Sequence, residues 1–244
     1  MNNQILVELQ SWMGNDREIA ESAWTSSFNK DTREQKTDEQ VAELVPRLIK
    51  DGHGTQFESV IFRIWIRMPI YTDRQHCTHR IGSHVEDSHN GLSGRYRTMP
   101  LDYFDLPEDV EVILAKVERD TIVRPCPNAD WNIFESYYES CETAINNYRL
   151  GIEQLKQAEK EAVITNAEFK RVREILRGQL PTSGMVERTT IMNLRSFANY
   201  QFQRNSLHDQ PEIKQVEQLM LEEVKKANVA PIAIKTLEEM GWKL

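Results

Sequence analysis

The residues between Arg74 and Tyr96 have the composition of a site that binds an anion. The segment contains the sequences RQHCTHRIGS and LSGRY, and arginines occur within it and close to it on both sides. These arginines are Arg63, Arg67, Arg74, Arg80, Arg95 and Arg97. A guanidinium donates paired hydrogen bonds to a phosphate or a carboxylate. Because the whole chain has a formal net charge of −8, this positive cluster indicates a local anion site. A solvated charged face is the alternative.

The cysteines do not form a recognisable catalytic or metal site. Cys77 lies inside the basic segment, Cys126 lies in a Pro-Cys-Pro sequence, and Cys141 stands apart from both. The sequence has no CxxC pair of the kind that holds zinc and no Pro-Cys-His sequence. No thiol stands next to an identifiable base in the sequence. We therefore expect no metal site, and we expect the cysteines to be small packed side chains rather than covalent catalysts.

Charge and hydrophobicity argue against several classes of protein. A net charge of −8 does not suit a protein that coats nucleic acid, since such a protein needs a basic face. No stretch approaches the roughly 18 uncharged apolar residues of a membrane span. The first residues, MNNQILVELQ, do not have the basic start and apolar run of a secretory signal. We expect a cytoplasmic protein that binds neither nucleic acid nor membranes.

The hydrophobic pattern predicts the elements that position the basic segment. Residues 5–9 read as a short strand, and Asp16 is the expected N-cap of a helix that continues to Phe28. A second helix starts at Thr37 or Asp38 and ends at Gly52. These elements precede the basic segment and would form part of the core beneath it.

A buried strand is expected directly before the basic segment. Bulky residues dominate residues 60–68, and their alternation places Phe62, Ile64, Ile66 and Met68 on one face. Pro69 is expected to end this strand. Residues 70–100 then show no period long enough for a core helix or strand. A loop of this length inside a compact domain is usually functional or disordered, and its polar composition favours function.

The second half of the chain is mainly helical in pattern. Two helices are predicted to begin at Trp131 and at Ala167. A strand is predicted from Met185 to Met192, followed by a helix with Asn193 as its N-cap and by a last helix over residues 212–227. A chain of 244 residues with 39% hydrophobic content can bury one substantial core. We expect an α+β fold in a single domain over residues 1–244, with a central, mostly antiparallel sheet flanked by helices.

The order of these motifs resembles the signature of the flavin-dependent thymidylate synthases, the ThyX family. That signature is Arg-His-Arg followed by Ser, Glu and Ser-x-Arg, and HGTQFES before the strand and Pro69 is similar to the family's approach to it. Further along, Arg177 lies four residues before Pro181, as in the family's Arg-x-x-Leu-Pro stretch. Asn-Leu-Arg-Ser at residues 193–196 and the Arg-x-x-x-His spacing of residues 204–208 also match. The resemblance spans about residues 5–225.

The resemblance implies an activity, its cofactors and its site residues. The activity is reductive methylation of dUMP at C5, with carbon from 5,10-methylenetetrahydrofolate and hydride from FAD that NADPH reduces. It also implies a homotetramer with active sites shared between subunits. The residues implied to bind the nucleotide are Gln75, Thr78, Glu86, Ser93, Gly94, Arg95, Arg177 and Arg204. The residues implied to bind FAD are His53, Thr55, His79, Arg80, Asn193, Arg195, Asn199 and His208.

Arg204 is the expected catalytic residue. A guanidinium held against N3 and O2 of the pyrimidine favours loss of the N3 proton and moves electron density to C5. The alternative for Arg204 is a basic residue that stabilises a helix C-terminus. Asn193 has a similar alternative as an N-cap, and His53 as a helix-end residue.

Two departures from the family pattern leave the substrate open. Thr78 stands where the family has the first arginine of Arg-His-Arg. If Glu86 is the family's glutamate, residues 87–91 are an insertion, and Asn90-Gly91 predicts a flexible turn there that tunes specificity. In the other alignment the glutamate is lost. The remaining hypotheses are a variant that acts on dCMP or leaves a hydroxymethyl group, and a flavin- or nucleotide-binding protein without synthase activity.

Overall fold

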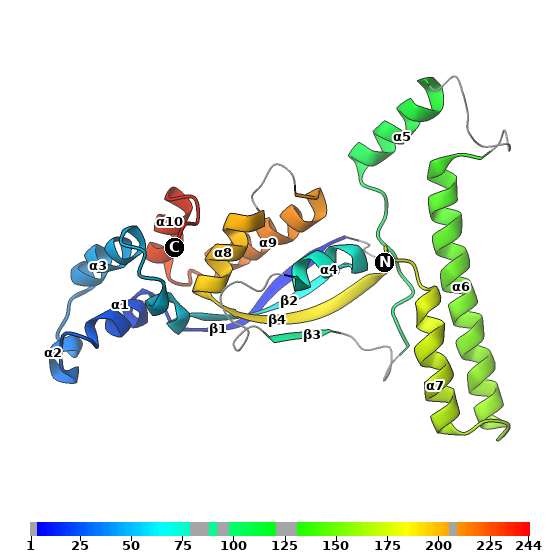
Figure 1. The fold of residues 1–244 in the computed structure, drawn as a ribbon, viewed down its shortest axis with the longest axis horizontal. Helices are drawn as coiled ribbons and strands as arrows, with labels where there is room; N and C mark the ends of the chain where they lie inside the picture. The colour runs from blue at the N-terminus through cyan, green and yellow to red at the C-terminus, as the bar shows by residue number, and fades with distance from the viewer. Residues whose placement is uncertain (1–3, 79–87, 92–97, 121–130, 205–208) are drawn as a thin grey trace. The chain divides into compact units, whose positions relative to one another are not determined.

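The computed structural model describes residues 4–78, 88–91, 98–120, 131–204 and 209–244 (Figure 1). The chain divides into two compact units. Unit 1 consists of Met1–Gln4, Pro69–Tyr71 and Leu92–Val186, and unit 2 of Ile5–Met68, Thr72–Gly91 and Glu187–Leu244. Within the described residues, no helix is long and apolar enough to cross a membrane.

Four strands form one sheet in the order β1-β2-β4-β3. They are β1 (Leu6–Met13), β2 (Ile61–Pro69), β3 (Ser88–Gly91) and β4 (Met185–Asn193). β1 pairs antiparallel with β2, and β3 pairs antiparallel with β4. Every second residue of β2 from Phe62 to Met68 is completely buried. The predicted strand and its apolar face are therefore confirmed.

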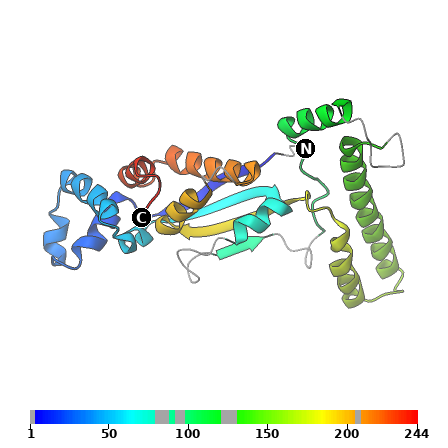
Figure 2. The same ribbon diagram turned by 45° about the horizontal axis from the view of Figure 1, so that its top comes forward.

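Helices of 5 to 16 residues make up the rest of unit 2. They are α1 (Asp16–Trp24), α2 (Lys30–Glu34), α3 (Asp38–Lys50), the 3-10 helix η1 (Gly54–Ser59), α4 (Ile70–Cys77, whose first two residues belong to unit 1), α8 (Leu194–Arg204), α9 (Pro211–Lys226) and α10 (Pro231–Glu239). α9 packs against β1, and α8 packs against both α9 and η1. Both views show α8 following directly on β4 (Figure 1, Figure 2). The α+β prediction, with a sheet flanked by helices, is confirmed.

Local capping signals account for the start and the end of α3. Thr37 caps α3 with a complete capping box that includes Gln40. Gly52, just past the end of that helix, has φ +71°, a left-handed conformation that favours glycine. Of the two predicted starting residues, Thr37 is thus the N-cap.

The N-cap predicted for the first helix was wrong by one residue. Asn15 is the N-cap of α1, and its side chain accepts a hydrogen bond from Arg17 N at 2.8 Å. The Asp16 carboxylate instead accepts hydrogen bonds from the backbone N–H groups of Ile232 and Ala233, at 3.0 and 2.9 Å. It thereby caps α10, a helix that the sequence pattern did not predict. Residues so far apart in the sequence carry no local signal of this contact.

The prediction that residues 70–100 lack regular structure was wrong for two segments. α4 covers Ile70–Cys77, and its buried residues Thr72 and His76 are polar, so the helix shows no apolar period. Residues 88–91 form β3, in register with β4 from Ser88↔Ile191 to Gly91↔Arg188. The predicted flexible turn is therefore contradicted over these residues, while Asp87 lies outside the described ones. Backbone pairing to an existing strand edge decides this segment, and its SHNG sequence cannot show it.

Unit 1 is mainly helical. It contains α5 (Glu108–Asp120), α6 (Ile133–Lys160), α7 (Asn166–Leu176) and the 3-10 helix η2 (Arg177–Gln179). α6 and α7 confirm the helices predicted from Trp131 and Ala167, and their N-caps are Asn132 and Thr165. α5 was not predicted. The single domain expected over residues 1–244 stays a prediction.

Candidate functional site

Helix α8 carries predicted site residues from one end to the other. Its start is fixed by Asn193, whose Oδ1 accepts a hydrogen bond from Ser196 N at 2.8 Å. Asn193 is therefore an N-cap, as its alternative interpretation proposed. The helix is also tied to the loop before β2, because Leu194 N donates to Val60 O at 2.8 Å. These contacts set the direction in which α8 leaves β4.

The N-terminal end of α8 lies against η1. Arg195 Nη1 donates to Glu58 Oε1 at 2.7 Å. A Cβ on Gly54 would lie 2.9 Å from Arg195 Nε, so a larger residue at this position would displace the Arg195 side chain. His53 and Thr55 flank this glycine and are exposed. The structure thus brings three residues implied to bind FAD, His53, Thr55 and Arg195, to one place.

Asn199 is the member of this set with an unused buried donor. Its Nδ2 is buried and has no hydrogen-bond partner among the described residues. Ser196 Oγ, also on α8, is in the same condition. Buried polar atoms are nearly always hydrogen-bonded in native proteins, so Asn199 Nδ2 is a donor suited to a water or a ligand. An amide donor and a nearby guanidinium suit the acceptor atoms and phosphates of a flavin nucleotide.

The C-terminal end of α8 lies against α4. Arg204, the last residue of α8, donates from Nη2 to Gln75 O at 3.0 Å and from Nη1 to Asp209 Oδ1 at 3.3 Å. Arg204 and Asp209 side chains are each only 16% exposed. Within the described part of the chain, Arg204 Nε and Asp209 Oδ2 are buried without a partner. The guanidinium is thus held by contacts from outside its own helix, which disfavours the alternative of a simple helix cap.

Three residues implied to bind the nucleotide meet at this end. Besides its bond from Arg204, the Gln75 carbonyl accepts a hydrogen bond from Thr78 Oγ1 at 2.8 Å. The Gln75 side-chain amide donates to Gln210 Oε1 at 2.5 Å, just before α9. The hydroxyl proton of Thr78, the residue just after α4, is therefore donated to the last turn of that helix. Thr78 contributes no positive charge here, where the family has an arginine.

Sequence reasoning missed the polar contacts beneath α4. His76 is completely buried, with Nδ1 at 3.0 Å from Tyr200 Oη and Nε2 at 2.9 Å from Thr190 Oγ1. Asp73 forms a two-bonded ion pair with Arg188 at 2.5 and 2.8 Å. The only sequence signals for these contacts are spacings, such as Arg188 and Thr190 on one face of β4. Such spacings do not identify partners.

The thiols in the described residues are poor nucleophiles. Burial, followed by the charge of Asp73, raises the pKa of Cys77 to about 11, and its Sγ donates to Asp73 Oδ1 at 3.6 Å. Burial also raises the pKa of Cys141, whose Sγ lies 3.3 Å from Ser183 Oγ. Both groups are thiols rather than thiolates near neutral pH. This supports the expectation that they are not covalent catalysts; Cys126 lies outside the described residues.

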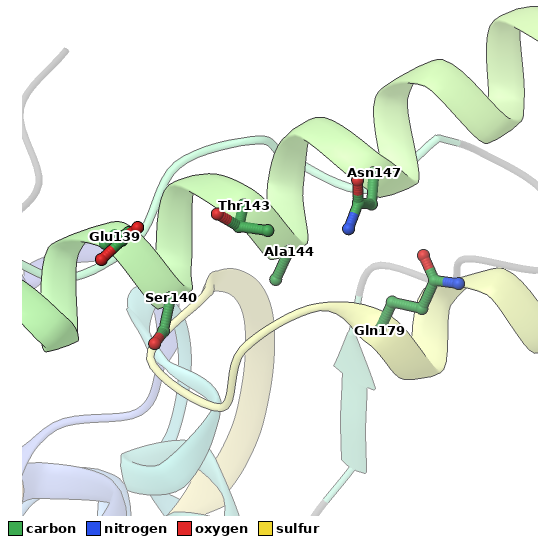
Figure 3. A pocket seen from close by; sticks show the side chains of 6 residues that line it. All are labelled: Glu139, Ser140, Thr143, Ala144, Asn147 and Gln179. Atoms are coloured by element: carbon green, nitrogen blue, oxygen red, sulfur yellow. The ribbon is translucent and has the colours of Figure 1, made fainter. Parts of the chain in front are cut away.

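The other predicted site residues fall elsewhere. Arg177 is exposed at the start of η2 in unit 1, whereas the site residues discussed above belong to unit 2. Seven predicted residues lie outside the described ranges: His79, Arg80, Glu86, Ser93, Gly94, Arg95 and His208. Unit 1 also has an open polar groove of about 700 Å³ between α6 and η2 (Figure 3). None of the predicted site residues lines this groove, which is formed by Glu139, Ser140, Thr143, Ala144, Asn147 and Gln179.

Comparisons with known proteins agree with the ordered motifs. The family model Thy1, described as thymidylate synthase complementing protein, matches residues 8–232. A flavin-dependent thymidylate synthase of Thermotoga neapolitana is 25% identical over 209 residues, which cover 86% of this chain and 80% of the relative. One of Kosmotoga olearia is 30% identical over 179 residues, which cover 73% of this chain and 69% of the relative.

A solved structure has the same fold. The UMP/dUMP methylase PolB from Streptomyces cacaoi, bound with 5-Br dUMP, superposes with a TM-score of 0.67 at 20% sequence identity. The superposition covers 98% of this chain and 97% of that one. Since the family model spans nearly all of the chain and the relatives match over most of their length, the chain belongs to the Thy1 family of flavin-dependent thymidylate synthases.

Proposed function

We propose that this protein is a thymidylate synthase that methylates dUMP at C5. In this proposal the carbon comes from 5,10-methylenetetrahydrofolate and the hydride from FAD that has been reduced by NADPH. Family membership supports the reaction class. The single observation that carries the mechanism is Arg204, a mostly buried guanidinium held by Gln75 O and the Asp209 carboxylate.

The surroundings of Arg204 suit a group that activates a pyrimidine. Two of its nitrogens are held by the protein, and Nε has no partner among the described residues. An N–H directed at O2 or N3 of uracil would favour loss of the N3 proton, which makes C5 more nucleophilic. Little reorganisation is needed, because α4 and Asp209 already orient the guanidinium. A cysteine nucleophile is not required by this route.

The N-terminal end of α8 would hold the flavin. Arg195 supplies a half-exposed positive charge, Asn199 supplies a buried amide donor, and His53 and Thr55 lie beside Arg195. FAD, when bound, supplies the hydride that completes the methyl group. The role of these protein residues is to bind and orient it relative to the nucleotide. His79, Arg80 and His208 are proposed for the same site from the family pattern.

A second candidate is a related activity on another pyrimidine nucleotide or with a hydroxymethyl product. It is favoured by Thr78, whose hydroxyl donates to Gln75 O and which brings no cation to the site. The neighbour PolB is named as a methylase of both UMP and dUMP, so UMP is a further substrate to test. A binding protein without synthase activity is the remaining alternative.

The phosphate of the nucleotide is proposed to be bound by Arg95 and Arg177, together with Gln75 and the backbone of residues 93–95. Ser93, Gly94 and Glu86 are proposed to bind the nucleotide from the family pattern. In the proposed homotetramer, active sites are shared between subunits. Exposed apolar residues on the helices of unit 1 support an assembly that covers them: Val112 and Ile113 on α5 are 65% and 56% exposed. We also propose that the protein is cytoplasmic.

Product analysis by mass spectrometry tests the proposed function. The protein is incubated with FAD, NADPH and 5,10-methylenetetrahydrofolate, and with dUMP, UMP or dCMP in parallel. We expect dTMP from dUMP, and no dTMP when either NADPH or the folate is omitted. A methylated or hydroxymethylated product from another nucleotide would favour the second candidate. FAD binding with no product from any nucleotide would leave a protein without synthase activity.

A further inference from the structure

His76 is a buried polar residue that the proposed reaction does not use. It lies on α4 with 0% exposure, and its two ring nitrogens are 3.0 Å from Tyr200 Oη and 2.9 Å from Thr190 Oγ1. Its ring also meets the Tyr200 ring edge to face, with centroids 5.3 Å apart. A hydroxyl can donate or accept, so the neutral imidazole satisfies both contacts in either tautomer. His76 therefore bridges α4 to α8 on one side and to β4 on the other.

The bridge to α8 lies one helical turn from Arg204. Tyr200 and Arg204 are four residues apart, so their side chains share a face of α8. On the facing helix, Gln75 and His76 are consecutive. α4 and α8 are thus joined at two neighbouring points, through His76 with Tyr200 and through the Gln75 carbonyl with Arg204. The first contact sets the distance between the helices at which the second is made.

The bridge to β4 holds α4 in place along its length. Arg188 and Thr190 lie two residues apart on β4 and so point to the same side of the sheet. Arg188 pairs with Asp73, and Thr190 contacts His76, which lies one turn further along α4. Two polar contacts on one strand therefore fix both the position and the rotation of the helix that carries Gln75.

We propose that His76 is a positioning residue that holds α4 against α8, so that Gln75 O orients Arg204 for catalysis. This inference rests on the proposed function, because it assigns His76 an effect on the step that Arg204 accelerates. Without the imidazole, the hydroxyls of Tyr200 and Thr190 lose their contacts to α4, and the spacing between α4, α8 and β4 is no longer held by these contacts. Arg204 would then be held by a carbonyl that has moved.

The kinetic test uses changes of a few atoms. Tyr200→Phe removes one hydroxyl and keeps the ring, and we expect kcat for dUMP methylation to fall about three- to tenfold, as for loss of one hydrogen bond. His76→Phe should lower kcat by roughly tenfold or more, since it removes both contacts. The apparent KM for dUMP should change by a smaller factor than kcat in both variants, because Arg204 acts mainly on charge that develops in the transition state. In an Arg204→Ala background, neither change should lower kcat much further.

Tyr148→Phe is the matched control. Tyr148 is also fully buried, and its hydroxyl accepts a hydrogen bond from Met99 N at 3.3 Å within unit 1. This variant should lower Tm about as much as Tyr200→Phe while leaving kcat unchanged. If Tyr200→Phe and His76→Phe lower only Tm, or if their effect on kcat persists fully without Arg204, then His76 has a structural role alone.

A crystal structure of His76→Phe gives a readout that does not depend on turnover. The Arg204 Nη2–Gln75 O distance is 3.0 Å in the native chain. We expect this hydrogen bond to be broken or replaced in the variant, and an unchanged bond would overturn the inference. If the wild-type protein methylates no nucleotide, the proposed function fails, and this structure still decides whether His76 positions Arg204.

Discussion

The two ends of α8 each carry an arginine, and the two arginines lie in different surroundings. Arg195, near the N-terminus, has a side chain that is 44% exposed, and it pairs with Glu58 at 2.7 Å. Arg204, at the C-terminus, is only 16% exposed, and it is held by Asp209 and by the carbonyl of Gln75. The exposed guanidinium of Arg195 can therefore adjust its position, whereas the guanidinium of Arg204 is held in one orientation.

The helix dipole explains part of this difference. The N-terminus of a helix carries a partial positive charge, which disfavours Arg195 and favours an anion beside it. Glu58 compensates for this in the described structure, and an anionic ligand would do the same. The C-terminus carries a partial negative charge, which favours Arg204. Arg195 is therefore suited to bind an anionic group that a ligand already carries. Arg204 is suited to stabilise negative charge that develops on a substrate during a reaction.

The largest effect is expected at Arg204. Arg204→Ala should lower kcat for dUMP methylation by a factor on the order of 10² or more, as for loss of one preorganised charge-stabilising donor. Arg204→Lys should restore little of it, because an ammonium cannot reproduce the planar guanidinium. Single-turnover methylation at saturating dUMP measures this. Flavin reduction by NADPH, followed by stopped-flow absorbance on the same preparation, should remain.

Arg177, which is proposed to bind the phosphate of the nucleotide, provides the contrast to Arg204. Arg177→Ala should chiefly raise the apparent KM for dUMP, because a contact to the phosphate is the same in the ground and transition states. Full methylation by Arg204→Ala at saturating nucleotide would remove Arg204 from the mechanism. The comparison of the two helix ends would then be one of stability alone.

A smaller effect is expected at the other end of α8. Arg195→Ala should weaken FAD binding about tenfold, as for loss of one hydrogen bond from a charged group. Titration followed by flavin fluorescence gives the Kd. Glu58→Gln is the matched control: it releases Arg195 from its ion pair, so FAD should bind at least as tightly as to the wild type. Unchanged FAD affinity in Arg195→Ala would show that the flavin is not held at this end.

The next prediction concerns the exclusion of water from the Glu217 carboxyl, beside the C-terminal half of α8. Gln201 of α8 donates to the backbone carbonyl of Glu217 at 3.2 Å, and burial raises the pKa of the Glu217 carboxyl from 4.5 to about 7. Since the folded-state pKa lies above the unfolded one, the protonated carboxyl is favoured in the fold. Its contribution to stability is complete below pH 4.5 and is lost as the pH rises through about 7.

Glu217→Gln should therefore stabilise the protein at about pH 8 but not at about pH 4. The expected gain is about 1 kcal/mol at the higher pH, after allowance for solvent screening. Urea denaturation at the two pH values measures the free energy of unfolding. An equal difference between variant and wild type at both pH values would mean that Glu217 is solvated in the folded chain.

The smallest effect is expected at Cys77, on the helix that faces Arg204. Cys77→Ser should leave kcat within about twofold of the wild type, since the serine hydroxyl can replace the partly buried thiol in its contact with Asp73. Alkylation of the native protein should be slow at neutral pH and accelerate toward the pKa of about 11. A nucleotide adduct on Cys77, seen by mass spectrometry, would instead make this cysteine a covalent catalyst.

Sequence patterns predicted those elements whose signals are local. The alternation in β2, the capping box of α3 and the N-cap of α8 each depend on residues within a few positions of one another. α4 and β3 escaped prediction because their residues are polar and their stability comes from partners elsewhere in the chain. The N-cap of α10 is Ala230, and the capping carboxylate is supplied by Asp16.

The sequence by itself determined the family and the chemical types of the site residues, because the ordered motifs depend only on residue identity and spacing. It also predicted that Asn193 begins a helix, and it offered a place at the C-terminal end of that helix as an alternative for Arg204. Only the tertiary structure decided what each arginine touches. Gln75 and Arg204 are separated by 129 positions and yet share a hydrogen bond. Burial and the partners of a charge, which set its pKa and its orientation, arise from packing between elements and are not encoded at any one position.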